Sequence, residues 1–231
     1  MDNPFERYIR FRDEISSQAD ALFARYAGHL TCRRGCYYCC DEITVLPVEL
    51  HALRRYLDEH GRPDPERLGG PPEDRGETPE AIRERDERRS VDRSAYGTFG
   101  PTPGAHRRCA FLGREGECTV YEARPVICRT HGLPLAYRVY EYDQHGREVA
   151  PEHPQYTDLW CDLNFTTLDE RRASASFDEH GRINMDAANR RIEELNEAFL
   201  QSEAGRAYRD LEPGEERQPL GVLLKPGRFA R

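Results

Sequence analysis

The sequence predicts an α+β protein that is mainly helical and loop-rich, in which helices frame a cysteine-lined metal centre and strands form short hairpins. Three amphipathic segments indicate helices, and strand-forming residues around turn signals indicate the hairpins. Eight cysteines lie between these elements. The hydrophobic fraction of 37% is low and the charged fraction of 33% is high. We therefore expect a thin core, to which metal–thiolate bonds add stability.

The N-terminal segment predicts a helix that begins at Asn3 and ends at Gly28. Asn3 is a favoured N-cap residue, a proline follows it, and Glu6 suits the positive end of the helix dipole. Apolar residues then recur at three- and four-residue steps: Phe5, Tyr8, Ile9, Ile15, Ala19, Leu22, Phe23 and Tyr26. A second helix is opened by Pro47 and closed by Gly61. The first cysteine-rich loop therefore lies between two helices.

The C-terminal part predicts one more helix. Asn184 is expected to cap it, and its buried face carries Met185, Ala188, Ile192, Leu195 and Phe199. The apolar segment 220–224 is compatible with either a short strand or a docking segment.

We expect two domains: a cysteine-cluster metal-binding domain over residues 1–177, and a C-terminal helical appendage over residues 178–231 that packs on it. Residues 61–106 are expected to form a polar, partly flexible insertion in the first domain. Turn residues and a charged run replace an apolar stripe there.

The later cysteines are expected on a hairpin, a helical turn and a loop. Cys109 and Cys118 flank a glycine-containing turn, which predicts that they lie on the two arms of a short hairpin. Pro125 is expected to open a helical turn that presents Cys128. Residues 137–142 and 147–149 predict another hairpin, and Cys161 follows in a late loop.

The spacing of the cysteines indicates metal binding. The first four follow a C-x3-C-x2-C-C pattern, which a packed core does not require but converging thiolates do. The partners of this stretch are expected among the four later cysteines. All eight are therefore candidate metal ligands: Cys32, Cys36, Cys39, Cys40, Cys109, Cys118, Cys128 and Cys161.

Thiolates suit zinc, copper(I) and iron–sulfur clusters, and the spacing favours an iron–sulfur cluster, above all 4Fe–4S. The last four cysteines are separated by 8, 9 and 32 residues, which is loose for a zinc ribbon. Cys39 and Cys40 are adjacent and point apart too readily to chelate one zinc together. Zinc remains the alternative. Two four-thiolate sites, one larger polynuclear site, or one four-cysteine cluster beside structural or redox thiols are all compatible with eight cysteines.

Cations flank the cysteines. Arg124 and Arg129 are predicted to lie at the cofactor, where they would offset the negative charge of a thiolate-bound cluster. Arg33 and Arg34 fit either this role or simple solvation. His131 follows Cys128 by three residues and is either a ligand or, more commonly for a lone histidine, a structural hydrogen-bonding group.

The composition also limits location and partners. The net charge of −8 argues against nucleic acid as a partner, and no membrane partner is expected because no long apolar stretch occurs. The N-terminus lacks the apolar run of a signal peptide, so we expect a cytoplasmic protein with reduced thiols. The alternative is an exported protein with four disulfides. The expected partner is an unidentified protein or small-molecule redox partner.

Several of these motifs resemble the YkgJ-type cysteine-cluster family of zinc- or iron-chelating domains. The resemblance covers roughly residues 20–165 and includes both cysteine blocks with the helix opened by Leu46-Pro47-Val48-Glu49. It continues through Cys128-Arg129-Thr130-His131-Gly132 and Cys161-x-Leu163-Asn164-Phe165. The resemblance implies metal chelation by the cysteines. A similar cysteine block in flagellin lysine methylases implies possible S-adenosylmethionine chemistry.

Three functions follow from these patterns. The first is an iron–sulfur or iron protein for electron transfer or redox chemistry, and the second is a structural zinc module that mediates protein contacts. The third is an S-adenosylmethionine-dependent enzyme, because Cys32-x3-Cys36-x2-Cys39 has the spacing of the radical S-adenosylmethionine cluster motif. A barrel pattern is not evident for the third. The sequence assigns no catalytic residue and leaves enzymatic activity uncertain.

Overall fold

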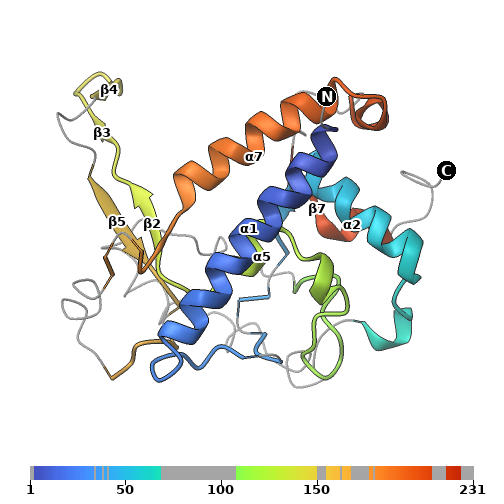
Figure 1. Ribbon diagram of the computed structural model, residues 1–231, viewed down its shortest axis with the longest axis horizontal. Coiled ribbons are helices and arrows are strands. Elements are labelled where there is room, and N and C mark those ends of the chain that lie inside the picture. Colours follow the sequence, from blue (N-terminus) through green and yellow to red (C-terminus); the bar gives the residue numbers. More distant parts are fainter. Residues whose placement is uncertain are drawn as a thin grey trace. The chain divides into compact units, whose positions relative to one another are not determined.

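The chain is a mixed α+β protein, as predicted, in the computed structural model shown in Figure 1. The structure describes residues 3–33, 35–37, 39–40, 42–68, 108–149, 155–161, 163–167, 177–178, 180–209 and 217–224. Two compact units are distinguished by their internal contacts. The first comprises Met1–Arg10, Arg33–Pro125 and Leu195–Arg231, and the second comprises Phe11–Cys32 and Val126–Glu194. The predicted domain boundary at residue 177 remains a prediction.

The predicted helices are present with closely similar bounds. The α-helices in the described residues are α1 (Pro4–Arg25), α2 (Pro47–His60), α5 (Val126–Thr130) and α7 (Met185–Leu200). Short 3-10 helices cover η1 (Pro65–Arg67), η2 (Tyr121–Ala123), η3 (Ala204–Tyr208) and η4 (Leu220–Leu224). The five residues predicted on the buried face of the last helix are all buried.

Both predicted asparagine caps are confirmed. The backbone N–H of Phe5 donates to Asn3 Oδ1 at 3.0 Å, and the N–H of Ala187 donates to Asn184 Oδ1 at 3.0 Å. The N-terminus of α2 instead uses a side chain distant in sequence, because the N–H of Val48 donates to Asn196 Oδ1 at 3.1 Å. These bonds satisfy backbone donors that a helix leaves unpaired in its first turn.

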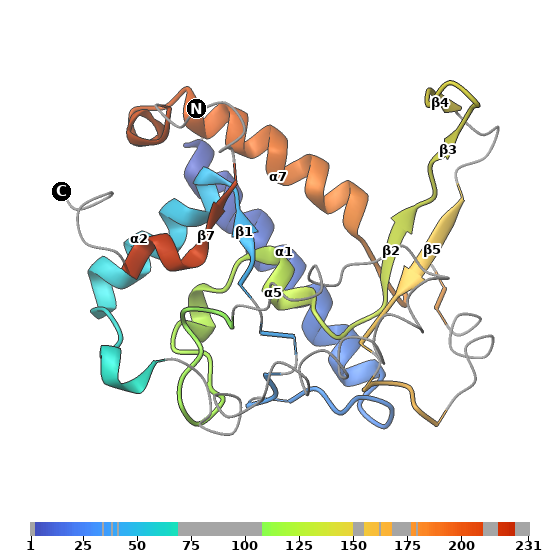
Figure 2. The ribbon, with the colours of Figure 1, turned by 180° about the vertical axis from the view of Figure 1, so that it is seen from behind.

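The first unit packs α2 against the short helices η2, η3 and η4 and contains a two-stranded sheet. Strand β1 (Thr44–Val45) pairs antiparallel with β7 (Gln218–Pro219), as Figure 2 shows. Segment 220–224, predicted as a strand or a docking segment, is a 3-10 helix that contacts α2. Of the two alternatives left open for this segment, the strand is not formed: β7 ends at Pro219, and the buried side chains that follow lie in the 3-10 helix.

The second unit contains a three-stranded sheet in the order β5-β2-β6. Strand β2 (Leu135–Arg138) pairs antiparallel with β5 (Tyr156–Leu159) and parallel with β6 (Ile183–Asn184). The predicted hairpin is confirmed in its outer part, where β3 (Glu141–Tyr142) pairs with β4 (Glu148–Val149). Strand β5 was not predicted.

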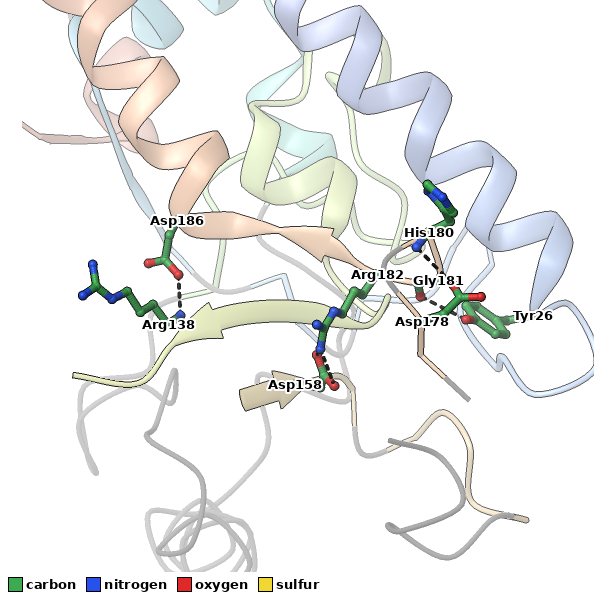
Figure 3. Close-up of polar contacts among 8 residues, drawn as sticks. All are labelled: Tyr26, Arg138, Asp158, Asp178, His180, Gly181, Arg182 and Asp186. Atoms are coloured by element: carbon green, nitrogen blue, oxygen red, sulfur yellow. Dashed lines mark hydrogen bonds and ion pairs between the residues drawn. The ribbon is translucent and has the colours of Figure 1, made fainter. Parts of the chain in front are cut away.

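Side chains fasten the sheet of the second unit to its helices. Arg182 Nη1 contacts both carboxylate oxygens of Asp158, at 2.8 and 3.0 Å. Arg138 donates its backbone N–H to Asp186 at the start of α7, and the Tyr26 hydroxyl donates to the carbonyl of Gly181 at 3.0 Å. Figure 3 shows these contacts gathered around β2 and β6.

Residues 69–107, which form the larger part of the predicted flexible insertion, lie outside the described residues. Within the described residues, none of the helices has the length and apolarity needed to cross a membrane.

Candidate metal centre

The eight predicted ligands share one state: each cysteine is half-buried and lies outside a disulfide. Five belong to the first unit, namely Cys36, Cys39, Cys40, Cys109 and Cys118, and three belong to the second, namely Cys32, Cys128 and Cys161. Cysteines outside disulfides can form the thiolates that bind a metal.

The first unit brings the two cysteine blocks together. The backbone N–H of Cys109 donates to the carbonyl oxygen of Cys40 at 2.9 Å. Next to this bond, the Arg108 guanidinium lies 5.7 Å from the centre of the Tyr37 ring. The backbone of the second block therefore lies against that of the first. That the later cysteines share a metal with the first stretch stays a prediction.

Gly116 provides the close contact between the blocks. Its φ of +79° lies in the left-handed region, and a Cβ there would fall 2.6 Å from Tyr37 Cδ1 and 3.4 Å from the carbonyl oxygen of Gly35. Only glycine fits such a position without strain. The turn of the second block is thus shaped to pack on the first.

Cys118 lies on a short hairpin, as predicted. It forms an antiparallel bridge with Leu112, and the neighbouring N–H of Thr119 donates to the carbonyl of Phe111 at 3.0 Å. Cys109 was predicted on the opposite arm of this hairpin, but it precedes that arm. Its carbonyl oxygen accepts a hydrogen bond from the N–H of Leu112 at 3.0 Å. The hairpin is shorter than expected because a tight turn occupies the positions after Cys109.

In the second unit, Cys128 lies on α5, the helical turn predicted after Pro125. Gly132 follows this helix with a φ of +94°, and a Cβ at that position would lie 2.5 Å from Cys32 Sγ. The sulfur of Cys32 therefore packs directly on the backbone of the Cys128 segment. This approach depends on the missing side chain of Gly132.

A buried asparagine, Asn164, contacts the same sulfur and was not predicted as a site residue. Its Nδ2 donates to Cys32 Sγ at 3.2 Å and to the carbonyl of Gly132 at 2.6 Å. Its backbone N–H donates to the carbonyl of Cys161 at 2.8 Å. The only sequence signal was its place in the Cys161-x-Leu163-Asn164-Phe165 stretch, because a single polar residue has no periodicity to reveal burial.

The predicted cofactor cations occupy different surroundings. The Arg124 guanidinium lies over the Tyr121 ring, 3.7 Å from its centre, and Nε donates to the Tyr121 carbonyl at 3.1 Å. Arg129 lies in the last turn of α5, one residue after Cys128, and is half-buried. His131 is also half-buried, and its backbone N–H donates to Ile127 at 3.1 Å. Contact of these side chains with a cofactor stays a prediction.

The chemistry of the donors fits a soft metal. Among the described residues, no three His, Cys, Asp or Glu side chains stand close enough together to hold an ion. In this described part of the chain, backbone contacts and the Asn164 side chain join cysteine-bearing segments, but three ligand side chains are not gathered. The donor set itself, eight half-buried cysteine sulfurs outside disulfides, fits zinc or iron but not a hard cation such as magnesium or calcium.

Comparison with known proteins finds a related family. No curated protein and no solved structure matches this chain. A family model named CxxCxxCC, described as "Putative zinc- or iron-chelating domain", matches residues 31–145. The family name has two residues between its first two cysteines, whereas this chain has three between Cys32 and Cys36. Through residues 31–145, which contain seven of its eight cysteines, this chain belongs to the CxxCxxCC family of zinc- or iron-chelating domains.

Proposed function

We propose that this chain is an iron–sulfur protein whose clustered cysteines hold a cluster, with 4Fe–4S favoured, for electron transfer or redox chemistry. The observation that carries the proposal is the set of eight half-buried cysteines outside disulfides in a chain with a zinc- or iron-chelating domain. Eight thiols are more than one structural zinc ion uses. A bound cluster would supply one-electron chemistry.

The way the cysteines are distributed supports a cluster over a zinc ribbon. A structural zinc site usually pairs two short knuckles, whereas here the second block spreads its cysteines over a hairpin, a helix and a late loop. Iron–sulfur clusters take thiolates from several loops. The bond between Cys109 and Cys40 supports such a gathering of distant segments in the first unit.

The surroundings of the cysteines also suit a negatively charged centre. Arg108 lies over Tyr37 in the cysteine loop, and Arg129 is adjacent to Cys128. Cations near thiolates offset their negative charge and favour the deprotonated, metal-binding form. These cations would raise the reduction potential of a bound cluster.

Anaerobic purification followed by optical and EPR spectroscopy tests the proposal. We expect a brown protein with broad visible absorbance that bleaches on reduction, together with an EPR signal in the reduced form. A Cys109→Ser variant should lose most of this absorbance, whereas Ser202→Cys, a new thiol on an unrelated turn, should not increase it. A colourless wild-type protein that carries only zinc would refute the iron–sulfur assignment.

The zinc alternative has its own support in the description of the family, which names zinc beside iron. A structural zinc module predicts metal that survives aerobic purification, no redox activity, and unfolding when a chelator is added. Cooperative unfolding in EDTA without any visible absorbance would make this the leading function.

The S-adenosylmethionine alternative has less support. Within the described residues, the sheets contain two or three strands, and none is part of a barrel of parallel strands. Addition of S-adenosylmethionine to the reduced protein tests this function. If the EPR signal of the cluster is unchanged by the cofactor, the alternative is excluded.

A further inference from the structure

Asn164 is a buried amide with every polar atom of its side chain engaged. It is 2% exposed. Its Oδ1 accepts from the backbone N–H of Thr31 at 2.8 Å and of Cys32 at 3.3 Å. Its Nδ2 donates to the carbonyl of Gly132 at 2.6 Å and to Cys32 Sγ at 3.2 Å.

The orientation of this amide follows from its partners. The Gly132 carbonyl can only accept a hydrogen bond, and the backbone N–H groups of Thr31 and Cys32 can only donate. An amide rotated by 180° would place donor against donor and acceptor against acceptor. The group that faces the Cys32 sulfur is therefore the NH2 end, which donates to it.

Asn164 connects three cysteine-bearing segments of the second unit. It bonds directly to Cys32, and through Gly132 it contacts the segment that follows the Cys128 helix. Its own backbone closes the turn after Cys161 at 2.8 Å. One side chain thus ties together the segments of Cys32, Cys128 and Cys161, which are far apart in sequence.

The position of Asn164 is itself held firmly. The next residue, Phe165, is buried and adopts a φ of +58°, and its N–H donates to the carbonyl of His29 at 2.7 Å. Its ring packs edge-on against Tyr26 and Phe177, with centres 5.4 and 5.1 Å away. A side chain anchored in this way loses little entropy when it holds a sulfur in place.

We propose that Asn164 is a positioning residue of the metal centre: it fixes the Cys32 thiolate by an N–H···S hydrogen bond and aligns the segments of Cys128 and Cys161 for the metal. The proposal rests on metal binding by the cysteines, whether the metal is zinc or iron. Hydrogen bonds from such outer groups orient metal ligands, and their removal costs about 10–100-fold in metal affinity.

Two variants separate the role of the Asn164 Nδ2 donor from that of its Oδ1 acceptor. Asn164→Asp keeps an acceptor for Thr31 and Cys32 but replaces the donor with an oxygen, which faces the sulfur and the Gly132 carbonyl. Asn164→Ala removes both functions. The matched controls are Asn196→Asp and Asn196→Ala, because Asn196 is also buried, at 6% exposed, and caps α2 through Val48 without contacting a cysteine in any bond the structure gives.

The measurement is Zn²⁺ affinity of the reduced, metal-free full chain, by competition with a chelating dye, with folding checked by circular dichroism. We expect both Asn164 variants to bind Zn²⁺ about 10–100-fold more weakly than wild type. The Zn²⁺ affinity of both Asn196 variants should stay within about twofold of the wild-type value. This holds even where Asn196→Ala lowers thermal stability, because that substitution removes only a helix cap. Wild-type affinity in folded Asn164 variants would overturn the proposal.

A second measurement needs no substitution and is insensitive to stability. In wild-type protein loaded with ¹¹³Cd²⁺, NMR should detect a scalar coupling between the metal nucleus and the Asn164 Nδ2 hydrogens. Absence of this coupling while cadmium is bound overturns the proposal but leaves metal binding intact. Failure of the wild-type chain to bind Zn²⁺ or Cd²⁺ overturns this proposal, whereas the iron–sulfur function is decided separately by the iron and sulfide content of anaerobically purified protein.

Discussion

The backbone N–H of Cys109 donates a hydrogen bond to the carbonyl oxygen of Cys40 at 2.9 Å, although residues 61–106 separate the two cysteine blocks in sequence. The contact uses main-chain atoms, so it does not consume the thiol of either residue. It therefore brings both blocks of the first unit together while leaving their sulfurs available for a metal. Cys40 thus has a structural role in its backbone whatever its sulfur binds.

Gly132→Ala should destabilise the second unit by more than the strain of a left-handed backbone alone. Its φ is +94°, and a Cβ would lie 2.5 Å from Cys32 Sγ. We expect a loss of about 2–4 kcal/mol in the free energy of unfolding, from left-handed strain plus overpacking. Denaturant unfolding measures it.

Gly146→Ala is the control for that substitution. Gly146 also has a positive φ, of +73°, but nothing lies within 4 Å of its added Cβ. This variant should cost only about 1 kcal/mol, the conformational part. Equal losses in the two variants would show that contact with Cys32 is unimportant.

The ion pair between Arg182 and Asp158 should contribute measurably to stability. The Asp158 side chain is only 6% exposed, whereas that of Arg182 is 27% exposed. Arg182→Met leaves a buried carboxylate without its cation, and we expect a loss of about 2–3 kcal/mol, less than for a fully buried pair.

A double-mutant cycle with Asp158→Asn isolates this interaction. The control is the exposed pair Arg191–Glu194, whose side chains are 42% and 64% exposed. Its coupling should be below about 0.5 kcal/mol. A coupling just as small for Arg182 and Asp158 would contradict the expected role of their pair in fastening the sheet.

His51 should make the stability of the chain depend on pH. Burial, and then the positive charges of Arg55 and Arg54, lower the pKa of His51 from 6.5 to about 4. The folded state therefore favours the neutral ring, which packs edge-on against Phe5 and lies within hydrogen-bonding distance of the Tyr208 hydroxyl at 3.3 Å. The stability contributed by the neutral ring is fully present above pH 6.5 and is lost as the pH falls toward 4.

We expect wild type to lose about 1–2 kcal/mol more than His51→Gln over this interval. One pKa unit corresponds to about 1.4 kcal/mol, and solvent near the partly exposed ring reduces the full shift. Chemical denaturation at several pH values measures the difference, and cysteine protonation affects both proteins alike. His60→Gln, on the exposed end of α2, should keep the wild-type profile. Parallel profiles for wild type and His51→Gln would rule out this effect.

Local patterns in the sequence predicted the helices well. The apolar periodicity and the caps at Asn3 and Asn184 correspond to α1 and α7, and Pro47 and Pro125 precede or begin α2 and α5. These features depend on neighbours within a few residues, which a single sequence displays. The hairpin at Cys118 and the outer hairpin β3–β4 were predictable for the same reason.

Contacts between distant segments were not predictable. Strand β5 is only four residues long and pairs with β2, and β7 pairs with β1 from the other end of the chain. Asn164 is a site residue only because Thr31 and Gly132 reach it in the fold. Such pairings are decided by tertiary packing, to which a short segment contributes no periodic signal.

Iron and acid-labile sulfide analysis of anaerobically purified protein decides whether these cysteines hold an iron–sulfur cluster. We expect iron and sulfide in about equal amounts, near four of each per chain for one 4Fe–4S cluster, and a large loss of both in Cys36→Ser and Cys109→Ser. Protein that contains zinc without iron or sulfide would contradict this expectation.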